Sequence, residues 1–125
     1  MFIVVPEHGA AVRGDRIQAP RLRDIPSMSI TQVPVLVKFF GLKDLPEGQI
    51  HVPGTTSYLA LSTLIGKTLE SNYFSDEKGS VTLDTLVKDL PETNPVSENA
   101  QTVVLRYKDR DYIRQKGEEW VVYPK

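Results

Sequence analysis

The stretch Phe2-Ile3-Val4-Val5-Pro6-Glu7-His8-Gly9 sets the expectation for the rest of the chain. Its apolar part, Phe2 to Val5, ends at a proline, which is the pattern of a short buried strand followed by a turn. Glu7 and His8 come directly after it, so a carboxylate and an imidazole lie at the end of a strand as potential metal ligands. Gly9 permits a sharp turn there, because glycine accepts either sign of φ.

Adjacent residues of a regular strand point to opposite faces, so Glu7 and His8 can reach one metal ion only where the strand gives way to a loop. A catalytic zinc needs about three protein ligands, and this sequence supplies one convincing adjacent pair. Two polar residues before a glycine also occur often by chance, so the pair alone is a weak signal. The other histidine, His51, lies in a segment rich in proline and glycine and is expected at the surface, outside the site.

The 125 residues have the composition of a soluble globular protein, with 40% hydrophobic residues, 25% charged residues and a formal net charge of −1. This length predicts a single domain over residues 1–125. The small net charge gives no reason to expect nucleic-acid binding, and no apolar run is long enough to span a membrane. Met1 to Val5 is too short for a signal peptide, so we expect any export signal to lie outside this sequence. The absence of cysteine excludes disulfides and thiolate metal sites.

The rest of the chain predicts an α/β fold with two helices. A β-branched and aromatic run from Ser29 to Gly41 predicts a buried strand, with Pro34 tolerated near its start. Apolar residues at helical spacing predict one helix over about 57–71, capped by Thr55 or Thr56, and a shorter one over about 83–90, capped by Thr82. Both apolar stripes are expected in the core. The first stripe consists of Tyr58, Leu61, Leu64, Ile65 and Leu69, and Tyr73-Phe74 is expected to anchor the chain after it.

Alternating segments near the C-terminus predict an antiparallel meander with strands at about 103–107, 112–114 and 120–123. The residues from 91 to 100 are expected to form a polar connection before it. Aromatic side chains in the meander can stack on sugar rings, but we favour packing on one face of the sheet. These aromatic residues are Tyr107, Tyr112, Trp120 and Tyr123.

Four arginines lie between Ala10 and Asp24, opposed by two aspartates. Two interpretations remain open for this predicted loop. Its guanidinium groups can hold a phosphate bidentately beside Glu7 and His8, or the loop can be a solvated, salt-bridged surface. The arginines are Arg13, Arg16, Arg21 and Arg23.

An apolar strand ending in an acid-His-Gly triplet resembles the last metal-binding motif of the alkaline phosphatase superfamily, in which the acid is usually Asp. Longer strings closely resemble the cellulose phosphoethanolamine transferase family of bacterial cellulose-synthesis operons, from one end of the chain to the other. The resemblance covers the C-terminal fraction of that larger family protein. Its strings include Val5-Pro6-Glu7-His8-Gly9-Ala10-Ala11, Arg13-Gly14-Asp15-Arg16, Leu22-Arg23-Asp24-Ile25-Pro26, Pro95-Val96-Ser97-Glu98-Asn99 and Trp120-Val121-Val122-Tyr123-Pro124.

This resemblance implies part of a zinc-dependent periplasmic domain of an inner-membrane enzyme. The implied reaction moves phosphoethanolamine from phosphatidylethanolamine to a glucose hydroxyl of nascent cellulose, through a serine nucleophile. By position, Glu7 and His8 match two zinc ligands and Arg23 matches an arginine that faces the substrate phosphate. The implied fold is the C-terminal fragment of an alkaline-phosphatase-like sandwich. No string here matches the nucleophile motif, so we expect the chain alone to be inactive and to need the preceding part of the same protein.

An alternative hypothesis is a non-catalytic binding or structural module, which would use its sheet for a protein or polysaccharide partner and would need no metal. If the chain is the C-terminal part of the transferase, then on its own it exposes an apolar face that packs against the rest of the domain in the complete protein. Such faces tend to associate, so we expect homo-oligomers or strand exchange.

Overall fold

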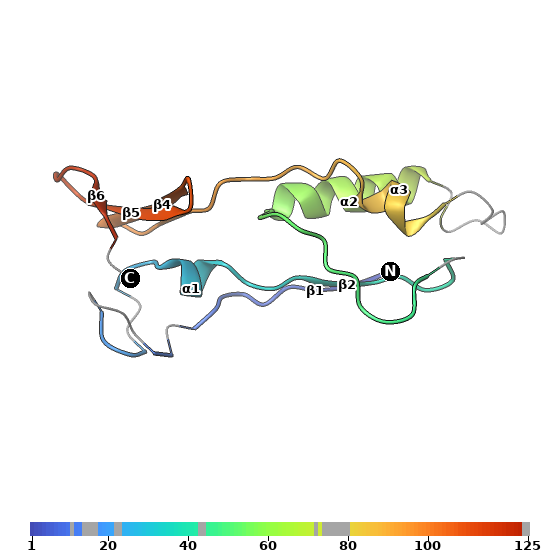
Figure 1. Ribbon diagram of the computed structural model, residues 1–125, viewed down its shortest axis with the longest axis horizontal. Helices are drawn as coiled ribbons and strands as arrows, with labels where there is room; N and C mark the ends of the chain where they lie inside the picture. The colour runs from blue at the N-terminus through green and yellow to red at the C-terminus, as the bar shows by residue number, and fades with distance from the viewer. Residues whose placement is uncertain are drawn as a thin grey trace. The chain divides into compact units, whose positions relative to one another are not determined.

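The computed structural model describes residues 1–10, 12–13, 18–21, 24–42, 45–71, 73 and 81–123. These residues form a mixed α/β structure with antiparallel sheets and a C-terminal meander, which confirms the predicted fold class (Figure 1). The elements are β1 (Phe2–Val4), α1 (Met28–Thr31), β2 (Leu36–Lys38), α2 (Tyr58–Glu70), α3 (Leu83–Val87), β3 (Val96–Glu98), β4 (Thr102–Tyr107), β5 (Arg110–Gln115) and β6 (Val121–Val122).

The chain divides into two compact units. The sheet unit consists of Ile3–Val37 and Asn94–Lys125, and the helical unit consists of Met1–Phe2 and Lys38–Thr93. Each unit is described separately below. The single domain over residues 1–125 and the alkaline-phosphatase-like sandwich stay predictions.

The sheet unit is built on a four-stranded antiparallel sheet in the order β3-β4-β5-β6. The turn between β4 and β5 consists of Lys108 and Asp109, which have φ values of 47° and 62°. Two central residues with positive φ make the type of two-residue turn whose twist suits a hairpin. The meander was therefore predicted correctly, and the hairpin begins and ends close to the predicted positions.

The strand β3 was not predicted, because Val96–Glu98 falls within the expected polar connection. It pairs with β4 through Ser97 opposite Val104. Ser97 is buried, and its hydroxyl donates to the Thr31 hydroxyl at 2.7 Å. The strand therefore depends on pairing with its neighbour and not on its own β propensity, which explains why the residue pattern missed it.

The core of the sheet unit lies where the hairpin of β4 and β5 meets the segment that contains α1. Val104 and Ile113 are cross-strand partners, and both point inward. Met28 from α1 belongs to the same buried cluster. The complete cluster consists of Ile25, Met28, Val104, Ile113 and Tyr123.

The two N-terminal strand predictions were partly wrong. β1 forms as expected and pairs with β2, but it is not buried, since the side chain of Phe2 is 56% exposed. The predicted strand from Ser29 to Gly41 is reduced to β2, with the helix α1 before it. Pro34 lacks an N–H and pushes the residue before it away from helical geometry, so it separates α1 from β2 instead of starting one long strand.

In the helical unit, α2 and α3 lie alongside each other (Figure 1). The cap of α2 is Ser57 and not Thr55 or Thr56, because the Ser57 hydroxyl accepts from the backbone N–H of Leu59 at 3.2 Å. Thr82 caps α3 as predicted, within a capping box completed by Thr85. The predicted span to Leu90 is too long, since Lys88 has extended geometry and Asp89 has a positive φ of 54°.

The face that α2 buries differs from the predicted one. Ala60, Leu64 and Thr68 are buried, whereas most of the predicted apolar stripe is exposed, Leu69 at 65%. The buried positions are four residues apart, so they form a helix face of their own, and two of their three side chains are small or polar. Helical spacing alone therefore identified the helix but not its core face.

The chain after α2 is anchored by Tyr73, as expected. Its hydroxyl donates to the backbone carbonyl of Phe40 at 2.6 Å and accepts from the N–H of the same residue at 2.9 Å. Its ring meets that of Phe39 edge to face, with 6.0 Å between the centroids. Phe74, the other expected anchor, lies outside the described residues. Within the described part of the chain, none of the helices has the length and hydropathy needed to cross a membrane.

Candidate functional site

The Glu7–His8 pair lies just beyond the end of β1, where the chain has left strand geometry. The Oε2 atom of Glu7 is 4.0 Å from the Nε2 atom of His8, so the two adjacent side chains converge instead of pointing apart. The side chain of Glu7 is 94% exposed and that of His8 is 40% exposed. The two side chains therefore lie near each other on one loop, and their role as metal ligands stays a prediction.

A hydrogen bond fixes the tautomer of His8. Its Nδ1 atom lies 2.7 Å from the backbone carbonyl of Gly9. Because a carbonyl oxygen only accepts, Nδ1 must carry the proton, and in the neutral ring the lone pair then belongs to Nε2. A backbone carbonyl in this role is what usually orients a metal-binding histidine. The nitrogen with the lone pair is also the one on the side of Glu7.

Gly9 attaches this loop to the helix α1. Its N–H donates to the backbone carbonyl of Ile30 at 2.6 Å. A Cβ atom at this position would lie only 2.1 Å from the carbonyl oxygen of Ser29. Gly9 is therefore needed for this close approach. The sequence-based explanation, a turn at unusual φ, differs from what is found, because Gly9 is absent from the glycines with positive φ.

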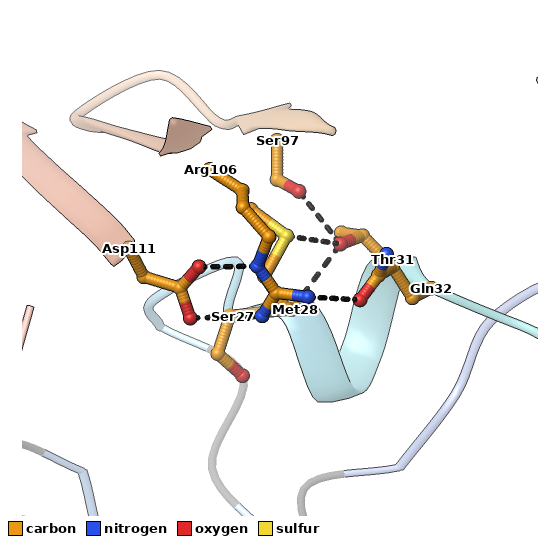
Figure 2. A network of polar contacts seen from close by, with 7 residues as sticks. All are labelled: Ser27, Met28, Thr31, Gln32, Ser97, Arg106 and Asp111. Carbon is orange, nitrogen blue, oxygen red and sulfur yellow. Dashed lines mark hydrogen bonds and ion pairs between the residues drawn. The ribbon is translucent and has the colours of Figure 1, made fainter. Parts of the chain in front are cut away.

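The helix α1 has four residues and lacks a side-chain hydrogen bond at its N-cap, so its position depends on tertiary contacts. Met28 supplies the apolar contact in the core. Two polar contacts come from the meander, through Thr31 and through Gln32, the C-cap residue (Figure 2). Thr31 accepts a hydrogen bond from Ser97 at 2.7 Å, and the Oε1 atom of Gln32 accepts one from Arg106 at 2.9 Å.

Arg106 is held in turn by Asp111, its opposite residue on β5. The Nε and Nη2 atoms of Arg106 donate to the two carboxylate oxygens at 2.7 and 3.0 Å, a bidentate pair (Figure 2). The side chain of Asp111 is only 9% exposed, against 31% for Arg106. The hydrogen bond to Asp111 raises the pKa of Arg106, against the opposing effect of burial, so the guanidinium stays charged at every relevant pH.

This network was not predicted, because a lone arginine and a lone aspartate carry no motif. The one signal that can reveal it is the hairpin itself. Once a two-residue turn is placed at Lys108 and Asp109, Arg106 and Asp111 become direct cross-strand neighbours of opposite charge.

The pair fits a zinc ion as part of a site. Zinc holds nitrogen and oxygen ligands at about 2.0–2.2 Å in a tetrahedral arrangement, which places two ligand atoms about 3.4 Å apart. The 4.0 Å between Glu7 and His8 is longer than this, so the two exposed side chains would have to approach each other slightly to hold one ion. Among the residues that the structure describes, no group of three or more His, Asp or Glu side chains can hold a metal ion. His51 is exposed in the helical unit, as expected for a residue outside the site.

Arg23, the predicted phosphate ligand, lies outside the described residues. The structure does define the segments on both sides of it. Gln18 is buried and makes two hydrogen bonds of 3.1 Å with the backbone of Ile25. The amide of Asn99 donates to the carbonyl of Asp24 at 2.8 Å. Residues on both sides of Arg23 therefore make contacts within the sheet unit, which also carries Glu7 and His8.

A carboxylate and an imidazole that converge on a supported loop are the candidate site of this chain. Comparison with known proteins then identifies the family. The family model of the cellulose biosynthesis protein BcsG C-terminal domain matches residues 1–120, and the chain belongs to this family. It is 49% identical to the cellulose biosynthesis protein BcsG of Salmonella typhimurium strain LT2 and 48% identical to that of Escherichia coli strain K12. Each match covers 99% of this chain and 22% of the relative, so the chain spans about a fifth of their length.

Proposed function

We propose that this chain forms part of the catalytic domain of a periplasmic, inner-membrane phosphoethanolamine transferase that modifies cellulose. Phosphatidylethanolamine is the donor and a glucose hydroxyl of the glucan is the acceptor. Membership of the BcsG family and the names of the relatives support a role in cellulose biosynthesis. The observation that carries the proposal is the convergence of Glu7 and His8, with the lone pair of His8 on the nitrogen near Glu7.

Each residue has a distinct role in this proposal. His8 offers Nε2 and Glu7 offers a carboxylate oxygen as two ligands of a zinc ion. When bound, zinc stabilises the negative charge that develops on the phosphoryl oxygens. Arg23 holds the phosphate group of the donor through two parallel hydrogen bonds.

The nucleophile is expected from the rest of the family protein. Ser27 and Ser29 are the nearest serines, and their hydroxyls hydrogen-bond to each other at 2.9 Å. Ser27 is buried beside α1. Both serines therefore support local structure, and we expect the purified 125-residue chain to show no turnover of phosphodiester substrates, with or without zinc.

The test is an exchange experiment. This chain replaces the matching 125 residues of the Salmonella relative, to which it aligns over 99% of its length, and cellulose made by the cells is purified and analysed for phosphoethanolamine by phosphorus NMR. We expect modified cellulose with the unaltered chain, and a loss of about a hundredfold or more with His8→Ala or Arg23→Ala, the size of losing one preorganised interaction with the transition state. His51→Ala, in the other unit, is the matched control.

Unmodified cellulose with the unaltered chain, when the exchanged protein is folded and the parent protein is active, would contradict the proposal. Full modification of cellulose with His8→Ala would contradict the proposed role of His8 as a zinc ligand. Modification that survives both substitutions would favour the other hypothesis, a non-catalytic module that binds a protein or the glucan.

A further inference from the structure

We infer that Arg106 is a positioning residue for the Glu7–His8 pair, acting through the helix α1. Its meaning for catalysis rests on the proposed function, but the positioning itself is a property of the sheet unit. Arg106 lies on β4, 98 residues after His8 in the sequence, and is not a ligand. Its effect is carried by an unbroken series of contacts.

The first part of the series joins the hairpin to the helix. Asp111 orients Arg106 bidentately, and Arg106 donates a third hydrogen bond to Gln32 at the end of α1. A bidentate pair fixes the plane of the guanidinium, so the third donor has a defined direction. Ser97 makes a second, parallel connection to α1 through Thr31.

The second part joins the helix to the ligands. The carbonyl of Ile30 receives the N–H of Gly9, and the carbonyl of Gly9 receives Nδ1 of His8. Gly9 lies directly against the carbonyl of Ser29, without space for a methyl group. A displacement of α1 therefore moves both the anchor of the loop and the group that fixes the tautomer of His8.

A four-residue helix has little stability of its own. The burial of Met28 holds it against the core, but an apolar contact is not directional. The hydrogen bonds from Arg106 and Ser97 are directional, so they set the orientation of α1 against the meander. Partners behind the ligands of a metal site commonly change metal affinity by about 10–100-fold when removed, and Arg106 fits this role at one further step from the metal.

The experiment uses nitrogen NMR of the two histidine rings in the 125-residue chain. His8 and His51 are the only histidines, so His51 in the helical unit is an internal reference. In the unaltered chain we expect the ring nitrogens of His8 to show the tautomer with the proton on Nδ1. In Arg106→Gln we expect the His8 signals to move toward the pattern of a ring that exchanges between its two tautomers. The His51 signals should stay unchanged.

A second variant protects the test against loss of the fold. Gln32→Ala combined with Ser97→Ala leaves the Arg106–Asp111 pair and the core intact and removes only the side-chain connections to α1. We expect it to move the His8 signals as Arg106→Gln does. Arg110→Gln is the matched control, because Arg110 is an exposed arginine at the start of β5. Backbone amide signals of Val104 and Ile113 report whether each variant is folded.

Zinc chloride added to the same samples gives the second measurement. We expect weak binding at His8 in the unaltered chain and about tenfold weaker binding in both variants. Folded variants with His8 signals and zinc affinity equal to those of the unaltered chain would overturn the positioning role. Displaced His8 signals without zinc binding in any sample would still support the positioning role, because two ligands are fewer than a zinc site needs. Zinc binding of equal affinity in all samples would refute a positioning role that reaches the ligands.

Discussion

The sheet unit and the helical unit are held together in different ways. In the sheet unit, polar side chains connect segments far apart in sequence, as Ser97 does with Thr31 and Arg106 with Gln32. In the helical unit the polar side chains that connect distant segments bond to backbone, as Tyr73 does at Phe40 and Lys67 at Lys88, and α2 leaves an apolar stripe exposed. Directional contacts specify position, whereas one-sided apolar packing leaves a surface that favours association. The unit with the candidate site is therefore the more precisely specified one.

The largest effect in this comparison is expected from Gly9→Ala. The added methyl group meets the Ser29 carbonyl, and relieving this contact breaks the hydrogen bond to Ile30. Overpacking costs about 1–3 kcal/mol and the hydrogen bond about 1 kcal/mol more. We expect the free energy of unfolding of the sheet unit to fall by about 2–4 kcal/mol, measured by urea titration with NMR detection. Unchanged stability would show that the loop is not docked on α1.

A smaller loss is expected from Asp111→Asn. The amide keeps the shape of the side chain but removes the charge that Arg106 faces, and it offers one acceptor oxygen instead of two. A hydrogen bond to a charged group contributes about 1.5–3 kcal/mol, and the partial exposure of Arg106 places the expected loss near 1–2 kcal/mol. Asp109→Asn in the exposed turn is the control, with a change below about 0.5 kcal/mol. Equal effects of the two substitutions would refute a special role for the buried carboxylate.

A glycine-to-alanine substitution in the helical unit should raise the free energy of unfolding instead of lowering it. Gly66 lies inside α2, and a Cβ there meets no atom within 4 Å. Alanine favours the helix over glycine by up to about 1 kcal/mol. We expect Gly66→Ala to raise the free energy of unfolding of the helical unit by about 0.5–1 kcal/mol in the urea titration used for Gly9→Ala. A loss of stability would mean that the α2 surface near Gly66 is covered.

The smallest effect on stability is expected from Leu69→Lys on the exposed stripe of α2. Its side chain is mostly in solvent, so the free energy of unfolding should change by less than about 0.5 kcal/mol. Self-association should decrease, measured by sedimentation velocity over a range of concentrations. Glu70→Lys, on the neighbouring exposed position, separates the gain of positive charge from the loss of apolar surface. If both variants associate as strongly as the unaltered chain, the stripe is not the contact surface.

The predictable parts of the fold were those with strong local signals. Helical spacing and Thr82 located α2 and α3, and alternation located the hairpin of β4 and β5. The core face of α2 was not predictable from hydropathy, because its buried positions include Ala60 and Thr68. The helix α1 was missed since it depends on contacts with segments about 70 residues away, such as the one between Thr31 and Ser97. The strand β3 was missed because it depends on pairing with β4.

The candidate site shows the same division. The convergence of Glu7 and His8 follows from a proline that ends a strand and from two adjacent polar residues after it. The contacts that hold this pair in place were not predictable from the sequence. The role of Arg106 depends both on the register of the hairpin and on the position of α1. The phosphate-binding role of Arg23 stays a prediction, because Arg23 lies outside the described residues.

The cross-strand pair of Arg106 and Asp111 also favours the native register of the β4–β5 hairpin. The turn at Lys108 and Asp109 has positive φ at both residues without a glycine, so the turn alone specifies the hairpin register weakly. A slip by one residue would turn Val104 toward solvent and separate Arg106 from its carboxylate. Only the native register then presents a correctly aimed guanidinium to Gln32. We therefore expect α1, and with it the loop of Glu7 and His8, to become ordered after the hairpin, so that misregistered molecules fail to bring Glu7 and His8 together.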